Sequence, residues 1–430
     1  METVNIFWFR RDLRLEDNLG LYEALKKGKT LPIFIFDSKI LDQLPDKYDA
    51  RVTFIYKQLT VLNKKLEKCN TSIALLSGSP IDCFKKLCDS YSIESVYCNE
   101  DYEPYGLERD KEIEEFLKSK KISFKKFQDH VICNPNEVFK KDGSPYTIYT
   151  PYSKQWKSTV SEKKIETYSS ESLLKNCINH NTQQLNIDKL GFKLSSINPP
   201  ELNLSSSIIT NYKKNRDYPS MSATTHLGIY LRFGTVSIRE IFLKFKKVDT
   251  SLIDELIWRE FFISILYHFP KVVKQSFKSK YDNIKWRYNE DDFDRWKEGK
   301  TGYPIVDAGM RELNESGTMH NRVRMITASF LCKHLLIDWR WGEAYFASKL
   351  LDFELASNNG NWQWASGSGC DSVPYFRVFN PTIQMEKFDK DYQYIKKWIP
   401  EFSDKDSYLQ PMVEHSFARD RALKAYKDAL

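Results

Sequence analysis

The chain has 430 residues, of which 41% are hydrophobic and 14% aromatic, and its formal net charge is +7. This length suggests two domains, and the composition predicts a packed globular protein. No apolar run approaches the roughly 18 residues of a membrane-spanning helix, and no secretory signal is visible, so we expect a cytoplasmic protein with no membrane partner. The positive charge is compatible with a polyanion but does not identify one.

The eight cysteines show neither a CxxC pair nor a metal-ligand spacing. In a reducing compartment such cysteines are most simply free thiols. We therefore expect no disulfide framework, no iron–sulfur cluster and no metal site.

In residues 1–130, five short apolar runs alternate with longer charged amphipathic segments. The runs cover residues 4–9, 31–36, 73–76, 95–98 and 123–127. This alternation is typical of βαβ units and predicts a Rossmann-like α/β domain with a parallel sheet. The domain has no G-x-G-x-x-G or P-loop motif, so the sequence assigns it no phosphate-binding function.

Residues 131–205 predict an interdomain linker, because much of this stretch is rich in Ser, Asn and Lys and has weak periodicity. Beyond it the strand-like runs end and helical periodicity dominates, so we expect an all-helical domain over residues 206–430. Eight of the ten tryptophans lie beyond residue 250. Packing alone explains this concentration poorly, because a buried indole N–H needs a hydrogen-bond partner.

The segment 252–262 has helical spacing that places Glu255, Trp258, Arg259 and Phe262 on one side. A carboxylate, an indole and a guanidinium on one face are suited to a polar pocket. The alternative is a surface helix in which Glu255 and Arg259 form an ion pair.

The segment 319–330 predicts a second helix, with Asn321, Arg324 and Met325 on one face. Such a row is suited to lining a pocket, although a methionine is also typical of core packing. A buried Arg324 needs an acidic partner, and we expect that partner to be Asp352.

Two further segments carry polar groups suited to ligand binding. Consecutive hydroxyls in 223–228 precede an apolar helical run, which favours either a phosphate at a helix N-terminus or a simple N-cap. In 358–364, amides accompany Trp362 and Trp364. We expect a turn or extended segment there, in which one indole faces a flat chromophore and the other a substrate pocket.

Taken together, seven motifs resemble those of the photolyase/cryptochrome family, in the same order from the first strand to about residue 400. They are WFRRDLR at 8–14, NL at 18–19, TTHL at 224–227, ELIWREF at 255–261, TGYPIVDA at 301–308, MHNRVRM at 319–325 and NNGNWQW at 358–364. The resemblance is greatest to microbial class I cyclobutane pyrimidine dimer photolyases. It implies an N-terminal antenna domain, a helical FAD-binding domain, and blue-light repair of a dimer flipped out of UV-damaged DNA.

The resemblance also implies which residues hold FAD. They are Tyr212, Thr224, Thr225, His226, Leu227, Arg259, Asn321, Arg324, Asp352 and Asn358. The pair of Arg324 and Asp352 is expected against the isoalloxazine ring, and Asn358 is expected to face flavin N5 in a catalytic role. Because signalling cryptochromes have an acidic residue or a cysteine at that position, Asn358 favours repair.

A second, antenna chromophore is left open. Folate-binding members of this class have an Asn-Glu pair where this chain has Glu103 followed by proline, so a folate is disfavoured. A deazaflavin, a flavin or no antenna are the alternatives.

For the DNA, the implied substrate positions are Glu255, Trp258, Asn321, Arg322, Met325, Trp364, Arg377 and Lys387. Glu255 and Met325 are expected to contact the dimer and to be catalytic. Trp258 and Trp364 are expected to stack on its bases, a contact that contributes about 1–3 kcal/mol per base. The three cations are expected to bind phosphates without sequence preference.

Trp286, Trp339 and Trp362 match the family's tryptophan chain for light-driven flavin reduction, and core packing is the alternative for each. We expect a monomeric DNA-repair enzyme, associated with the nucleoid if the source is bacterial. The alternative functions are a cryptochrome-like photoreceptor with little or no repair activity, and a nucleic-acid-binding protein without flavin.

Overall fold

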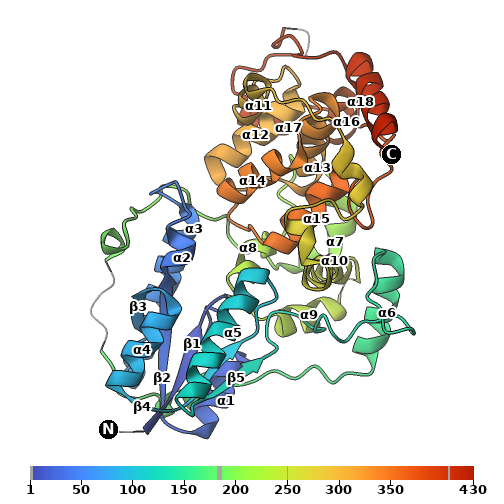
Figure 1. Ribbon diagram of the computed structural model, residues 1–430. Coiled ribbons are helices and arrows are strands. Elements are labelled where there is room, and N and C mark those ends of the chain that lie inside the picture. Colours follow the sequence, from blue (N-terminus) through green and yellow to red (C-terminus); the bar gives the residue numbers. More distant parts are fainter. Residues whose placement is uncertain (1–2, 182–185, 249, 405–406) are drawn as a thin grey trace. The chain divides into compact units, whose positions relative to one another are not determined.

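The computed structural model describes residues 3–181, 186–248, 250–404 and 407–430 (Figure 1). The chain divides into two compact units, each built from separate stretches of sequence. The first unit comprises Met1–Val138, Trp156–Asn198 and Leu227–Val248, and the second comprises Phe139–Gln155, Pro199–His226 and Asp249–Leu430.

The first unit centres on a five-stranded parallel sheet with the strand order β3-β2-β1-β4-β5. The strands are β1 (Thr3–Phe9), β2 (Thr30–Asp37), β3 (Ala74–Gly78), β4 (Ser92–Asn99) and β5 (Ser123–Phe127). Each strand contains or overlaps one of the five apolar runs, so the prediction of a parallel α/β domain is confirmed. The side chains of β1 and β2 are buried at nearly every position, as expected for strands covered on both faces.

Helices follow the strands of the first unit in turn, as βαβ connections require. They are α1 (Leu19–Lys27), α2 (Ser38–Leu41), α3 (Ala50–Leu66), α4 (Pro80–Ser90) and α5 (Pro104–Ser119), joined later by α8 (Leu227–Arg232) and α9 (Ile238–Lys246). Helix α1 begins after Asn18, whose side-chain oxygen accepts a hydrogen bond from Leu21 N at 3.2 Å. This cap satisfies a backbone donor that the first turn leaves unpaired.

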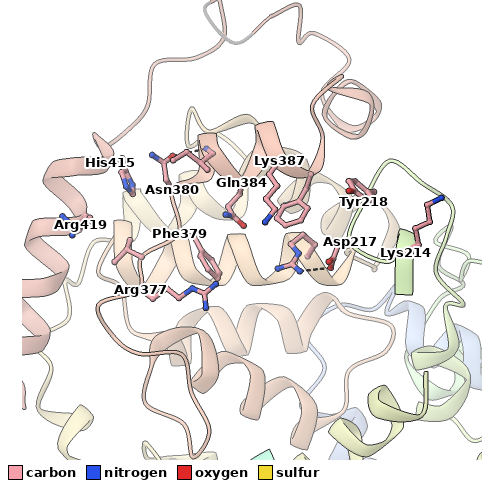
Figure 2. A pocket seen from close by; sticks show the side chains of 14 residues that line it. Lys214, Asp217, Tyr218, Arg377, Phe379, Asn380, Gln384, Lys387, His415 and Arg419 are labelled. Atoms are coloured by element: carbon pink, nitrogen blue, oxygen red, sulfur yellow. Dashed lines mark hydrogen bonds and ion pairs between the residues drawn. The ribbon is translucent and has the colours of Figure 1, made fainter. Parts of the chain in front are cut away.

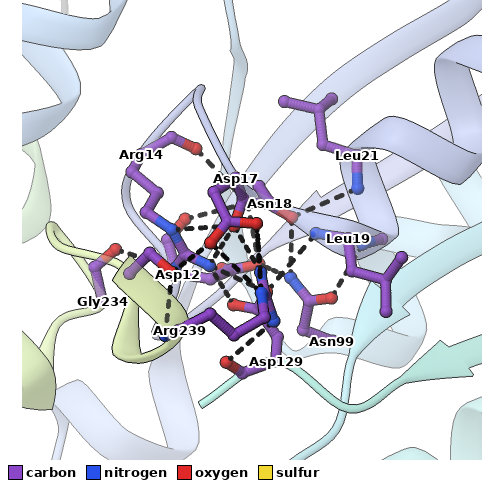
Figure 3. Close-up of polar contacts among 12 residues, drawn as sticks. Asp12, Arg14, Asp17, Asn18, Leu19, Leu21, Asn99, Asp129, Gly234 and Arg239 are labelled. Carbon is purple, nitrogen blue, oxygen red and sulfur yellow. Dashed lines mark hydrogen bonds and ion pairs between the residues drawn. The ribbon is translucent and has the colours of Figure 1, made fainter. Parts of the chain in front are cut away.

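A buried ionic cluster joins residues that follow strands β1 and β5 to helix α9 (Figure 3). Arg14 donates to Asp129 at 2.7 Å, Arg239 of α9 donates to the same carboxylate at 2.8 Å, and Arg239 also donates to Asp17 at 3.0 Å. Burial alone would raise the pKa of Asp129, but the two guanidinium groups hold that pKa below its ordinary value. The cluster thereby fixes α9 to the α/β part of the unit.

The segment expected to be a linker contributes to the first unit. Ile178 N donates to Thr30 O at 2.9 Å, and Ile187 and Phe192 are buried together with Val52 of α3. Short 3-10 turns, η2 (Glu171–Asn176) and η3 (Ile187–Leu190), lie in this segment. The described part of residues 156–198 is therefore packed structure, which its weak periodicity did not reveal.

The second unit is built from helices, as expected for the region after residue 205. They are α7 (Ser206–Asn215), α10 (Thr250–His268), α11 (Glu290–Lys297), α12 (Pro304–Ser316), α13 (Asn321–Ser329), α14 (Trp339–Lys349), α15 (Leu355–Ser366), α16 (Pro381–Phe388), α17 (Gln393–Trp398) and α18 (His415–Ala429), with α6 (Tyr149–Ser161) continuing into the first unit. No helix in the described part of the chain has both the length and the hydrophobicity to cross a membrane.

Helix α15 occupies the middle of the second unit and packs against α10, α13 and α14. Its close approach to α10 depends on Gly360, because a Cβ atom there would lie 2.1 Å from the Phe262 ring. No larger residue fits at this crossing without moving Phe262. Helix α15 is thus set against α10 and α13, which carry the candidate site residues of the segments 252–262 and 319–330.

Candidate active site

Trp362 and Trp364 lie within helix α15, so the expectation of a turn or extended segment is wrong. Residues two apart on a helix are separated by about 200° around its axis, and the two indoles therefore still point in different directions. Trp362 is buried in the core of the second unit, whereas Trp364 is partly buried at its margin. That one indole faces a chromophore and the other a substrate pocket stays a prediction.

The predicted helix over 252–262 is confirmed as part of α10, but Glu255 and Arg259 pair with other residues and not with one another. Glu255 pairs with Arg216, the residue after α7, and Arg259 pairs with Glu354 at 2.8 Å. The alternative of an ion pair between Glu255 and Arg259 is therefore wrong. Burial raises the pKa of Glu255 above its ordinary value, while Arg216 opposes that rise.

Trp258 of α10 is stacked on Tyr149, the first residue of α6. The ring centroids are 3.5 Å apart and the ring planes differ by 2°. The Tyr149 hydroxyl donates to Asp254 O at 3.1 Å, one turn before Trp258. No local sequence pattern indicates this partner, because Tyr149 and Asp254 are 105 positions apart.

The predicted helix over 319–330 is confirmed as α13 followed by the π-helical turn η6 (Phe330–His334). Arg322 on α13 donates to Asp217 at 2.7 Å and lies 3.7 Å from the sulfur of Met325. Because Asp217 follows Arg216 in the chain, the end of α7 contacts both Glu255 on α10 and Arg322 on α13. These contacts bring the candidate residues Glu255, Arg322 and Met325 to one region of the second unit.

Arg324 and Asp352 form the expected ion pair at 3.0 Å. Arg324 Nε also donates to Met319 O at 2.7 Å, which fixes the guanidinium in place. The second carboxylate oxygen of Asp352 is buried and has no hydrogen-bond partner. Such an acceptor is costly unless a donor meets it, so this oxygen is suited to a polar group of a bound ligand.

Asn358 on α15 is buried, and its amide nitrogen donates to two oxygens of Glu343: the backbone carbonyl at 3.1 Å and the side chain at 2.9 Å. Burial raises the pKa of Glu343, while the hydrogen bond from Asn358 opposes that rise. The orientation of the Asn358 amide is therefore fixed by α14.

The remaining candidate cofactor residues lie in α7, in the loop before α8 and at the start of α13. Tyr212 on α7 lies with its ring 5.7 Å from the Arg216 guanidinium, and burial raises its pKa. Thr224 is half-buried, and the carbonyl of buried Thr225 accepts from Asn203 N at 3.1 Å. His226 is exposed in a left-handed conformation with φ of 53°.

The short helix α8 begins at Leu227, in the first unit, so the hydroxyl-rich loop precedes a helix as predicted. Asn321 is the first residue of α13 and is exposed.

The three candidate electron-transfer tryptophans belong to one aromatic core. Trp339 and Trp362 are buried in it and Trp286 packs against it. The ring contacts of Trp362 and Trp286 are with other aromatic side chains, whereas the Trp339 ring centroid lies 4.7 Å from the Arg340 guanidinium. Trp362 lies 4.9 Å from Phe346, and Trp286 lies 5.9 Å from Tyr426. Gly342 of α14 makes room for Trp362, because a Cβ atom there would lie 2.1 Å from the indole.

A cavity of about 640 Å³ opens on the second unit, and we call it the basic groove (Figure 2). Its charged and aromatic lining comes from Lys214, Asp217, Tyr218, Arg322, Arg377, Phe379, Lys387, Phe388, His415 and Arg419. The groove thus brings together the three predicted phosphate-binding cations, Arg322, Arg377 and Lys387. Sequence reasoning missed Lys214, His415 and Arg419, which come from distant segments and carry no motif.

Two family models match this chain: "DNA photolyase" over residues 5–169 and "FAD binding domain of DNA photolyase" over residues 252–407. A deoxyribodipyrimidine photo-lyase of Alkalihalophilus pseudofirmus is 34% identical, over 99% of this chain and 98% of that protein. The enzyme of the same name from Escherichia coli is 32% identical, over 99% of both chains.

Solved structures similar to this chain are also photolyases. A bacterial class III photolyase from Agrobacterium tumefaciens has a TM-score of 0.88 and 31% identity, covering 100% of this chain and 98% of that one. An archaeal photolyase from Sulfolobus tokodaii with two FAD molecules has a TM-score of 0.84 and 33% identity, covering 99% and 100%. A parallel α/β unit and a helical FAD-binding unit define a two-domain flavoprotein architecture. The chain belongs to the DNA photolyase family.

Proposed function

We propose that this protein is a deoxyribodipyrimidine photo-lyase that uses blue light to repair cyclobutane pyrimidine dimers in DNA. Two ion pairs carry the proposal: Arg216 pairs with Glu255, and the next residue, Asp217, pairs with Arg322. They bring a carboxylate with a raised pKa on α10 to the same region as the phosphate-binding groove. Damaged DNA needs both kinds of contact at once.

The residues of the second unit fit a flavin. The unpartnered buried oxygen of Asp352 is an acceptor for a cofactor donor, and Arg324 beside it supplies positive charge that favours an anionic ring. With its nitrogen committed to Glu343, Asn358 has its carbonyl oxygen as the acceptor for an N–H of the ring. Bound, reduced FAD would supply light-driven transfer of an electron to the dimer, and the electron would return to the flavin after the cyclobutane ring has opened.

The chain's own residues position the dimer. Trp258 and Trp364 offer indole faces for stacking, which is worth about 1–3 kcal/mol per base. Glu255, whose pKa burial raises, can hold a proton and donate it in a hydrogen bond to a thymine carbonyl. Arg377 and Lys387 bind flanking phosphates from the exposed side of the groove.

We further propose that the protein works as a monomer in the cytoplasm, on the nucleoid if the source is bacterial. Support comes from the basic groove, which offers a surface for polyanionic DNA in a single chain.

The test is repair of an oligonucleotide carrying one cyclobutane thymine dimer by the reduced, FAD-loaded protein, in blue light and in darkness. Restoration of the two thymines in light alone supports the proposal, and Glu255→Ala and Trp258→Ala are then expected to lower it. No repair by a protein that retains FAD would turn the assignment to a photoreceptor.

A further inference from the structure

The described lining of the basic groove contains one negatively charged side chain among several positively charged ones. Of the described residues that line the groove, Asp217 is the single carboxylate, set against cations from α7, α13, α16, α18 and the loop before α16. It pairs with Arg322 at 2.7 Å, a contact drawn in Figure 2. The Asp217 side chain is 38% exposed and that of Arg322 is 20% exposed, so a ligand in the groove can reach the pair.

Arg322 is held in place by groups other than Asp217. Its guanidinium lies 4.5 Å from the Phe388 ring centroid and donates toward the Met325 sulfur at 3.7 Å. A planar guanidinium held in this way can serve a carboxylate or a phosphate through the same N–H groups. A phosphate that binds Arg322 must therefore compete with Asp217.

The competition for Arg322 is linked through the chain to Glu255, the carboxylate that is expected to contact the dimer. Arg216, one peptide bond before Asp217, pairs with Glu255. A dimer that bonds to Glu255 also perturbs Arg216, and Asp217 moves with it because the two residues share the turn that follows α7. Undamaged DNA, which leaves its bases stacked, makes no contact with Glu255 and leaves this turn as it is.

We infer that Asp217 is a specificity-determining residue, which occupies Arg322 until a lesion is seated and so withholds one phosphate contact from undamaged DNA. The inference rests on the proposed function. A cation that is free to neutralise a phosphate releases a counterion and steepens the dependence of log affinity on log salt by about 0.9. Arg322 contributes this increment to damaged DNA and not to undamaged DNA.

The test is Asp217→Asn, with binding measured in darkness on duplexes with and without one thymine dimer as salt rises from about 50 to about 200 mM. On undamaged duplex, we expect the slope of log affinity against log salt to steepen by about 0.9 in the variant. The ratio of the variant's affinity to that of the wild type therefore falls about threefold to fourfold over this range. The slope on damaged duplex stays unchanged. Equal steepening on both duplexes, or no change on either, overturns the inference.

Two further variants separate a local effect from added charge. Asp291→Asn changes the net charge equally at an exposed position on α11, outside the groove, and is expected to leave both slopes unchanged. In Arg322→Gln, adding Asp217→Asn is expected to have no effect on the slope, because the competing cation is gone. If Asp217→Asn weakens binding to both duplexes, Asp217 only positions Arg322 and the inference is overturned.

The outcomes remain distinct from a failure of the proposed function. A wild-type protein that repairs dimers in light but shows no altered slope in Asp217→Asn refutes this inference alone. A wild-type protein that neither prefers damaged DNA nor repairs it refutes both.

Discussion

Tyr149 lies face to face with Trp258, with ring centroids 3.5 Å apart and planes 2° apart. The tyrosine is held at two points, because its hydroxyl donates to Asp254 O at 3.1 Å and its backbone N–H donates to Asp371 at 2.7 Å. The partly exposed indole of Trp258 is thus backed by a fixed ring. A base that stacks on Trp258 meets a plane whose orientation is already set, which lowers the entropy lost on binding.

Replacing Tyr149 by alanine is expected to weaken binding of dimer-containing DNA. A stacked aromatic pair contributes about 0.5–1.5 kcal/mol, so the loss of affinity is expected to be roughly twofold to tenfold. Tyr149→Phe keeps the ring and is expected to bind nearly as wild type does. The measurement is fluorescence anisotropy of a labelled damaged duplex in darkness.

Tyr288→Ala is the matched control, because Tyr288 is 79% exposed. It is expected to leave the affinity unchanged. If Tyr149→Phe binds as weakly as Tyr149→Ala, the hydroxyl bond to Asp254 and not the stacked ring sets the affinity.

Repair is expected to depend on pH through Glu255. Burial raises its pKa and Arg216 opposes the rise, so the protonated carboxyl persists to higher pH than in an ordinary glutamate. Only that form donates a hydrogen bond to the dimer, and the yield is therefore expected to fall as pH rises through the raised pKa. Arg216→Gln removes the opposing charge and is expected to move the fall to higher pH.

The measurement is single-turnover repair under saturating light between about pH 5 and 8, where folded proteins are generally stable. Glu255→Gln always presents a donor and is expected to abolish the pH dependence. A profile in Arg216→Gln that moves to lower pH would contradict the assigned sign of the interaction.

Loss of Asp352 is expected to weaken FAD binding. The residue pairs with Arg324 at 3.0 Å and holds one buried, unpartnered oxygen. Hydrogen bonds to charged groups contribute about 1.5–3 kcal/mol, so Asp352→Ala is expected to lower the affinity roughly tenfold to hundredfold. The measurement is titration of the apoprotein with FAD, followed by flavin fluorescence.

Asp391→Ala, at an exposed position of the same unit, serves as the control and is expected to retain wild-type affinity. If Asp352→Ala binds FAD normally but has lost repair, the carboxylate acts on the dimer and not on the cofactor.

Features that depend on neighbouring residues were predicted well from the sequence, and features that depend on distant contacts were not. The strands were predictable because β1 and β2 are buried at nearly every position, and α10 was predictable because its helical spacing is visible within one short segment. The pair of Arg324 and Asp352 was predictable because a guanidinium that is largely withdrawn from solvent needs an anion. Each of these rules needs only neighbouring residues or one partner of known charge.

The misjudged features depend on distant packing. Gly360 and its flanking asparagines favour a turn locally, yet α15 is helical because its packing against α10, α13 and α14 overrides that preference. The partner of Glu255 is Arg216, 39 positions earlier, and not the residue one turn away on the same helix. No periodicity reports a contact of that kind.

The ionic cluster of Arg14, Arg239 and Asp129 predicts a specific stability defect. Asp129 is fully buried, and both arginine side chains are less than a tenth exposed. Asp129→Asn leaves two buried cations without their shared anion, and breaking such a pair costs about 3–5 kcal/mol. We expect the first unit of the variant to unfold at a lower urea concentration, followed by circular dichroism. Asp89→Asn, at an exposed position on α4, is expected to have no effect.

The same carboxylate predicts how this stability depends on pH. Because the arginines lower the pKa of Asp129 in the folded state, its contribution is fully present above the ordinary value of 3.8 and is lost as pH falls through the lower folded value. The difference in unfolding free energy between wild type and Asp129→Asn is therefore expected to stay constant from neutral pH down to about 4 and to shrink below that. A difference that already shrinks between pH 7 and 5 would mean that another group, and not Asp129, neutralises the two arginines.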